Sequence, residues 1–173
     1  MLEAALLSLA VASAPAAAPL SVADLRMSAP EEWLSKPSSS SMRVAQYEVP
    51  GKAGAAEAVV YYFGAGQGGS VDDNVARWFG QFTPDAGAKD IASVREKREA
   101  GEAKVTVVRA RGVYQSGMPM GPKTPKPGHA LYGIIIESPQ GPVFVKLTGP
   151  AATVDAAAAG CEALIKSIRL GGK

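Results

Sequence analysis

The segment from residue 59 to residue 82 constrains the fold most, because a strand pattern, a glycine-rich loop and a helix pattern follow one another there. Residues 58–63, AVVYYF, are rich in β-branched and aromatic side chains, which favour a strand. After the loop, Ser70 is a good helix N-cap, and Asp72 and Asp73 fall in the first turn, where the helix dipole favours negative charge. The segment therefore predicts a strand, a tight connection and a helix, in that order.

The predicted helix has one apolar and one polar face, so we expect it to lie on a sheet. The Thr-Pro pair at 83–84 is expected to end it. The polar face carries Asn74, Arg77 and Gln81, and we expect Arg77 to pair with Asp73 one turn earlier. The apolar stripe consists of Val71, Val75, Trp78, Phe79 and Phe82.

Two hairpin patterns follow this helix and indicate antiparallel pairing. The turn of the second, Ser-Pro-Gln-Gly at 138–141, places proline and glycine where a type I turn prefers them. A strand at 42–49 is expected to pair with strand 58–63, and a first short strand is expected near 25–27. The two hairpins join 91–98 with 103–113 and 130–137 with 143–148.

A last helix is expected from Thr153 to Ile168, with Cys161 on its apolar face. A lone cysteine cannot form an internal disulfide, and here it is interpreted as a small buried hydrophobe. The order of strands, helix, hairpins and helix predicts an α+β domain, an antiparallel sheet flanked by two main helices.

The N-terminal residues predict export to the periplasm or cell envelope. Residues 6–14 form an apolar run of signal-peptide length, too short to span a bilayer. Small residues favour cleavage after Ala16, with cleavage after Ala18 as an alternative. Glu3 and the absence of Lys or Arg before the apolar run are atypical, and an apolar helix kept in the fold is the other reading. We expect a signal peptide at 1–16 and a single domain at 17–173.

The charge pattern argues against nucleic acid as a partner. The formal net charge is only +2, and acidic and basic residues interleave between 89 and 126. Such a pattern is typical of a solvated face rather than of a basic stripe for phosphates. Few aromatic residues accompany it, so stacking of single-stranded bases is also unsupported.

The first candidate site is the glycine loop itself. Gly64, Gly66 and Gly69 spell G-x-G-x-x-G, the fingerprint of dinucleotide binding. However, Asp72 and Asp73 would repel a pyrophosphate at the helix N-terminus. The hairpin pattern after the helix also lacks the parallel strand that a Rossmann unit needs. The alternative is a tight connection that uses the backbone freedom of glycine.

The second candidate site lies in a predicted long loop from Gln115 to His129. Met118, Met120 and His129 offer thioether and imidazole ligands, which suit Cu(I) in an exported protein. The alternative is a proline-stiffened loop whose methionines pack on the sheet or on a protein partner.

The third candidate site is the polar helix face of Asn74, Arg77 and Gln81, which has no nucleophile beside it. The sequence has no GxSxG motif and only one histidine, so a Ser-His-Asp triad has no signature. These observations favour a protein without catalytic activity and without a cofactor over an enzyme.

Three segments resemble the Mog1/PsbP-like fold: Pro30–Trp33, residues 144–150 (FVKLTGP) and the helix ending at Ile168. The resemblance extends over roughly residues 25–170 and implies an antiparallel sheet flanked by helices. Within that fold, FGAGQGG followed by N, RW, QF and later KLTGP resembles an uncharacterised group of exported bacterial proteins. The sequence thus predicts an exported binding or accessory module that acts through loop surfaces on a protein or small molecule. A copper handler and a nucleotide-binding enzyme are the alternatives.

Overall fold

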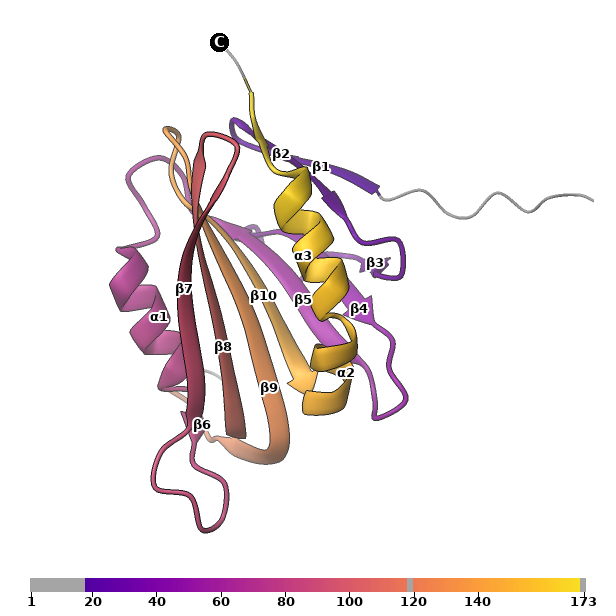
Figure 1. Cartoon of the computed structure of the whole chain (residues 1–173), viewed down its shortest axis with the longest axis vertical. Helices are drawn as coiled ribbons and strands as arrows, with labels where there is room; N and C mark the ends of the chain where they lie inside the picture. The colour runs from indigo at the N-terminus through magenta and orange to yellow at the C-terminus, as the bar shows by residue number, and fades with distance from the viewer. Residues whose placement is uncertain (1–17, 118–119, 172–173) are drawn as a thin grey trace, which may run out of the picture.

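The computed structural model describes residues 18–117 and 120–171. The predicted signal peptide, its first cleavage position and Met118 lie outside these residues. The described part contains two antiparallel sheets and three helices, which confirms the predicted α+β class (Figure 1). The helices are α1 (Val71–Phe79), α2 (Ala151–Ala156) and α3 (Ala158–Ser167).

The main sheet has eight strands, and the second sheet has three. The main-sheet strands are β3 (Leu34–Lys36), β4 (Arg43–Val49), β5 (Ala56–Tyr62), β6 (Phe82–Thr83), β7 (Ala92–Ala100), β8 (Ala103–Ser116), β9 (Thr124–Glu137) and β10 (Val143–Pro150). Their order is β3-β4-β5-β10-β9-β8-β6, and β7 also pairs with β8. The second sheet, in the order β1-β2-β11, consists of β1 (Ala18–Val22), β2 (Leu25–Ala29) and β11 (Arg169–Leu170).

Both predicted hairpins and the pairing of β4 with β5 are confirmed. In the turn between β9 and β10, the Gly141 amide donates to the Ser138 carbonyl at 3.0 Å, as a type I turn requires. The short strands β1, β3 and β11 were not predicted, because two to five residues carry too little periodicity to reveal a strand.

The predicted helix ends need correction. Helix α1 stops at Phe79 with Gly80 as its C-cap, so Phe82 belongs to β6 and pairs with Tyr114. Glycine is a poor helix former, which explains the earlier end. The predicted last helix is interrupted at Ala157 and forms α2 and α3.

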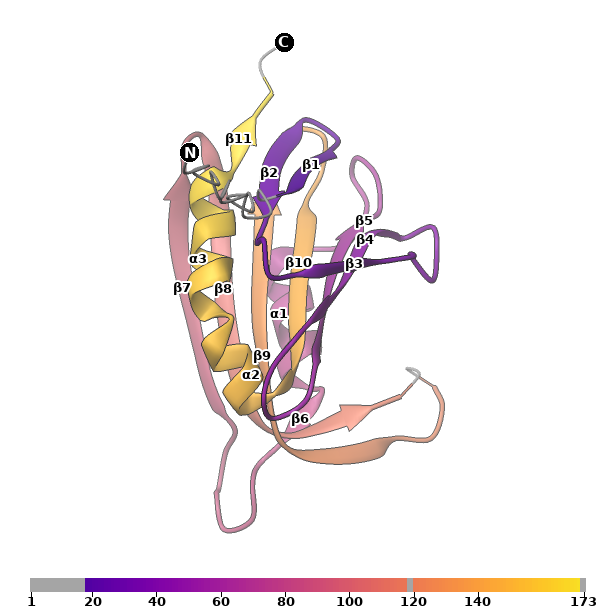
Figure 2. The ribbon, with the colours of Figure 1, turned by 90° about the vertical axis from the view of Figure 1, so that its right-hand side faces the viewer.

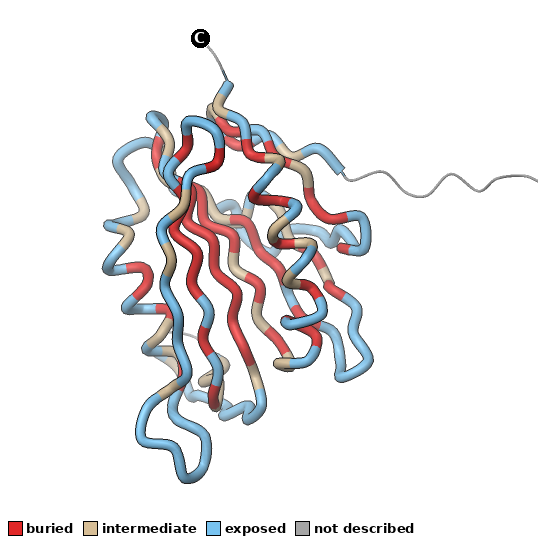
Figure 3. The backbone as a smooth tube through the Cα atoms, viewed as in Figure 1, coloured by how far each residue is buried: buried red, intermediate tan, exposed pale blue. Residues whose placement is uncertain are grey.

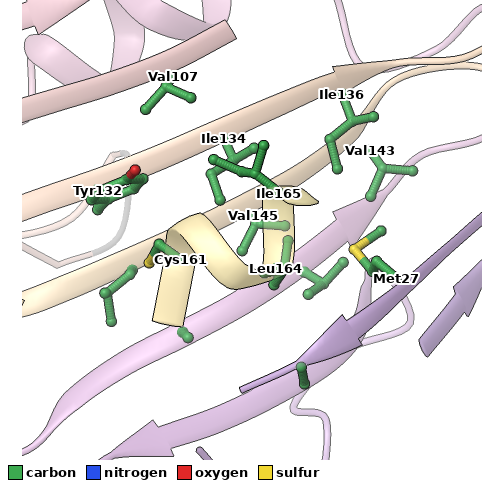
Figure 4. Close-up of a cluster of buried hydrophobic side chains, with 14 of the residues drawn as sticks. Met27, Val107, Tyr132, Ile134, Ile136, Val143, Val145, Cys161, Leu164 and Ile165 are labelled. Atoms are coloured by element: carbon green, nitrogen blue, oxygen red, sulfur yellow. The ribbon is translucent and has the colours of Figure 1, made fainter. Parts of the chain in front are cut away.

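Helices α2 and α3 and the three-stranded sheet cover one face of the main sheet (Figures 1 and 2). The buried residues run along the central strands beneath them (Figure 3). Leu164, Ile165 and Cys161 of α3 pack over Val145 and Ile134 of the sheet (Figure 4). Cys161 is 1% exposed, which confirms its predicted burial.

Charged residues tie α2 and α3 to strand β8 at the edge of this core. Glu162 of α3 accepts hydrogen bonds from Tyr132 Oη and from the guanidinium of Arg98, each at 2.6 Å. Arg109 lies 3.6 Å from the same carboxylate, and Arg111 pairs with Asp155. Arg109 and Arg111 thus follow the apolar residues along β8, and their ion pairs hold α3 and α2 at the edge of the core.

The opposite face of the sheet is only partly covered. Val75 and Trp78 of α1 pack with Phe82, Leu131 and Phe144 in a second core. The Trp78 ring lies directly over Gly133, where an added Cβ would come within 2.4 Å of the ring. Glycine in this central strand position is therefore explained by the close approach of the indole.

The predicted loop from Gln115 to His129 is largely strand, which corrects the prediction. Strand β8 continues to Ser116 and β9 starts at Thr124, so proline and glycine did not prevent pairing here. The register shifts between Gly112 and Tyr114, and Gly112 and Gly128 take φ values of 152° and 64°. This irregularity bends the end of the hairpin, the β8–β9 arm (residues 113–116 and 124–129), out over the uncovered face (Figure 2).

Candidate functional site

A small cavity of about 200 Å³ lies between α1 and the sheet, and we call it the helix pocket. Four aromatic side chains form most of its walls. The Phe144 ring centroid lies 5.7 Å from that of Phe63 and 6.3 Å from that of Trp78, both with edge-on geometry. Tyr61 stacks on Phe63 at 6.2 Å. The polar groups of the pocket are Asn74, Arg77, Gln81 and Lys146.

A larger hollow of about 640 Å³, the open groove, adjoins the helix pocket. Strands β3, β4, β5 and β10 form its floor, and the β8–β9 arm contributes Tyr114, Lys126 and His129. The bend of the arm creates this hollow, because a straight hairpin would leave the sheet face flat. The two cavities share Tyr61 and Lys146.

Lys146 lies where the two cavities meet. Its Nζ donates a hydrogen bond to Gln81 Oε1 at 2.5 Å and lies 5.5 Å from the ring centroid of Tyr114. Burial lowers the pKa of Lys146 from 10.5 to about 8; Glu57 opposes this effect, and the positive charges of Arg43 and Arg77 add to it. No ion pair joins Lys146 to any carboxylate of the described residues.

The other charges around the site leave it positive. The two carboxylates of the groove are already paired, Glu57 with Arg43 and Glu48 with Lys36, each at 3.1 Å. Arg77 donates a hydrogen bond to the neutral side chain of Asn74 and forms no ion pair with a carboxylate in the described part of the chain. The positive charge that remains is well placed for an anion.

The glycine loop packs against Phe63 and Phe144, two walls of the helix pocket. Gly64, Gly66, Gly68 and Gly69 all take positive φ values, between 69° and 102°. The buried Asn74 amide donates to the carbonyl oxygens of Gly68 at 2.7 Å and of Ser70 at 2.8 Å, and so fixes the loop on α1. A Cβ on Gly68 would lie 3.0 Å from the Phe144 ring.

The loop does not have the setting of a dinucleotide site. Every strand pair in the described part of the chain is antiparallel, so no Rossmann unit surrounds Gly64, Gly66 and Gly69. Asp72 on the first turn of α1 pairs with Arg95 at 2.6 Å. The geometry instead explains the glycines by the sharp strand-to-helix connection and the close approach to aromatic rings.

The structure brings the third candidate group together, with partners that the sequence reading missed. Asn74, Arg77 and Gln81 all line the helix pocket with Lys146. The expected pair of Arg77 with Asp73 is wrong, because Asp73 bonds to Ser70 Oγ at 2.6 Å while Arg77 bonds to Asn74. The one available signal for Lys146 was a lysine inside the apolar strand pattern FVKL.

Of the proposed copper ligands, the described residues include Met120 and His129, which lie at different places on the β8–β9 hairpin. Met120 is fully exposed near the tip of the hairpin. His129 stacks on Tyr114 at 6.5 Å, and its Nδ1 lies 3.0 Å from the Pro127 carbonyl oxygen. At ~3.3 Å per residue, the stretch of β9 from Thr124 places His129 roughly 16 Å from the start of the strand. Within the described ranges, no three or more His, Cys, Asp or Glu residues form a group that could hold a metal.

Cys161 is remote from these cavities, in the core on the other side of the sheet. Burial raises the pKa of its thiol to about 12. The thiolate is the reactive form of cysteine, and burial disfavours that form of Cys161 at neutral pH.

No protein-family model matches the sequence, and a search of curated proteins gives no match. The described helices are all too short or too polar to cross a membrane. The chemistry of the site therefore rests on its own residues.

Proposed function

We propose that this chain is an exported, single-domain binding module of Mog1/PsbP-like architecture that takes up a small anionic ligand without catalysis. The ligand site is the junction of the helix pocket and the open groove. The apolar N-terminal run supports export, and the antiparallel sheet with helices on both faces is in keeping with the proposed architecture. Periplasm or cell envelope is the corresponding location.

The observation that carries this proposal is the position of Lys146. A half-buried ammonium whose partners among the described residues are an amide and a ring loses hydration without gaining a counter-ion. A bound anion would supply the missing counter-ion and would raise the pKa of the amine toward its ordinary value. Binding of the anion would then recover the free energy that burial of this charge costs the folded protein.

The shape of the site favours a small molecule over a protein partner. The two cavities are concave and combine apolar walls with a few polar groups, as small-ligand sites do. Strand residues form most of the groove, so the site differs from the loop surfaces expected from the sequence. The lining also lacks a nucleophile with an adjacent base, which supports binding without turnover.

The test is titration with small anions at pH 6.5 and low salt. Acetate, benzoate, citrate and inorganic phosphate are the probes, and backbone amide shifts in ¹H–¹⁵N NMR spectra are the readout. We expect at least one anion to bind saturably to the wild type and at least tenfold more weakly to Lys146→Met. The proposal is wrong if no probe saturates, or if Lys146→Met binds as well as the wild type. Sequencing the N-terminus of the protein from a periplasmic extract tests export, with a start at Ala17 expected.

A further inference from the structure

We infer that the ligand is a small aromatic carboxylate, with its ring in the helix pocket and its carboxylate between Lys146 and Arg77. This inference rests on the proposed anion-binding function and adds the class of ligand. It follows from three properties of the helix pocket: aromatic walls, two cations in its lining and a small volume.

The walls are suited to a flat ring. Phe63, Trp78 and Phe144 meet edge to face, with centroids between 5.7 and 6.3 Å apart around Phe144. A further ring could extend this arrangement, because aromatic pairs prefer offset and edge-on contacts at such separations. Phe63 is 38% exposed, unusually open for a large aromatic side chain that is packed against two others. A bound ring would cover its free surface.

The cations approach the pocket from two different elements. Arg77 comes from α1 and Lys146 from β10, and both line the cavity together with the amide of Gln81. Their charges are close enough for Arg77 to disfavour the protonated form of Lys146. A carboxylate between them would attract both, and the planar guanidinium suits its two oxygens. Gln81 and Asn74 already hold the two side chains in place.

The volume limits the size of the ligand. At about 200 Å³, the helix pocket is smaller than the ~300–1,000 Å³ of sites for drug-sized ligands. One or two fused rings with an acid group match this space, whereas a nucleotide would have to extend into the open groove. The lining of the groove carries the paired charges of Arg43 and Glu57, which makes it the less attractive half for a second anion.

The experiment compares benzoate, cyclohexanecarboxylate and acetate by NMR titration of the wild type and of Phe63→Leu, Arg77→Gln and Lys146→Met. The indole N–H of Trp78 reports on the pocket, and that of Trp33, buried in the other core, is the internal control. Val94→Ala, at an exposed position on β7, is the matched control variant.

We expect benzoate to bind at least threefold tighter than cyclohexanecarboxylate and tenfold tighter than acetate, and to shift only the Trp78 indole. Phe63→Leu should weaken benzoate about threefold to tenfold and leave acetate unchanged. Arg77→Gln should weaken all three acids. Val94→Ala should bind like the wild type.

The outcomes separate the two proposals. If Lys146→Met abolishes binding but benzoate and acetate bind the wild type equally, anion binding stands and the aromatic class is wrong. If no carboxylate saturates the wild type, the aromatic class is wrong, and if inorganic phosphate also fails to saturate it, anion binding is wrong as well. If a hexaglutamate peptide binds while benzoate does not, the site serves an acidic chain, and the aromatic acid is again excluded.

Discussion

Replacing Lys146 with methionine should make the protein more stable while it removes anion binding. Methionine keeps the length and apolar stem of lysine but has no charge to desolvate. A pKa that falls from 10.5 to about 8 corresponds to about 3 kcal/mol at ~1.4 kcal/mol per tenfold change. The side chain retains some exposure and its hydrogen bond to Gln81 is lost in the variant. We therefore expect a gain of about 1–2 kcal/mol in the free energy of unfolding at pH 7.

The gain should depend on pH in a defined direction. Below pH 8 the amine is protonated in both the folded and the unfolded chain, so the whole cost of burying the charge is present. Between pH 8 and pH 10.5 the folded protein has released this proton while the unfolded chain still holds it. The unfolded state then binds more protons than the folded state. The stability of the wild type therefore rises with pH relative to that of Lys146→Met. The charged neighbours Glu57, Arg43 and Arg77 are the same in both proteins and largely cancel.

Urea denaturation followed by circular dichroism at pH 7 and at pH 10 measures both effects. Lys126→Met is the matched control, because Lys126 lines the same groove but is exposed. It should change stability by no more than about 0.5 kcal/mol. If Lys146→Met folds but is no more stable than the wild type at pH 7, Lys146 is well solvated and the reasoning about its cost is refuted.

Three further predictions test the packing and the hydrogen bonds of the sheet that supports the site. Gly133→Ala should destabilise the protein by about 1–3 kcal/mol in urea melts, because the added methyl group displaces the Trp78 ring; unchanged Trp78 fluorescence would contradict this. Glu162→Gln should lower stability by about 1–2 kcal/mol at pH 7. Burial raises the pKa of Glu162, but hydrogen bonds from Tyr132 and Arg98 outweigh it, so the net pKa is lowered. The deficit should therefore shrink as pH falls below about 4, and a constant deficit would oppose this account. Cys161 should resist iodoacetamide at pH 8 until urea unfolds the chain, and rapid labelling of the folded protein would disagree with its burial.

The fold was largely predictable because its signals are local. Alternation in the two hairpins, the Ser70 cap and the apolar stripe of α1 each act within a few residues, and each is confirmed. The β8–β9 arm was not predictable in this way. Its prolines and glycines are typical of a loop, and only pairing across the strands holds Thr124–His129 in the sheet. Bends of this kind depend on the partner strand rather than on the local sequence.

The site itself was only half visible in the sequence. Asn74, Arg77 and Gln81 could be placed on one helix face from their spacing, since a helix fixes which residues are neighbours. Their partners come from β5 and β10, which lie before and far beyond the helix in the chain. No periodicity relates Tyr61, Phe63 and Lys146, and only the antiparallel pairing of β5 with β10 brings them together.

Lys146 points to a ligand, and the glycine fingerprint does not. Each glycine of the loop is accounted for by the fold: a positive φ, a close ring or a carbonyl that Asn74 binds. Lys146 has no such account. The backbone pairing of its strand does not depend on a lysine at that position, and none of the described carboxylates forms an ion pair with its amine. A residue that the fold does not need, and that lowers the stability of the protein at its position, is most simply explained by ligand binding.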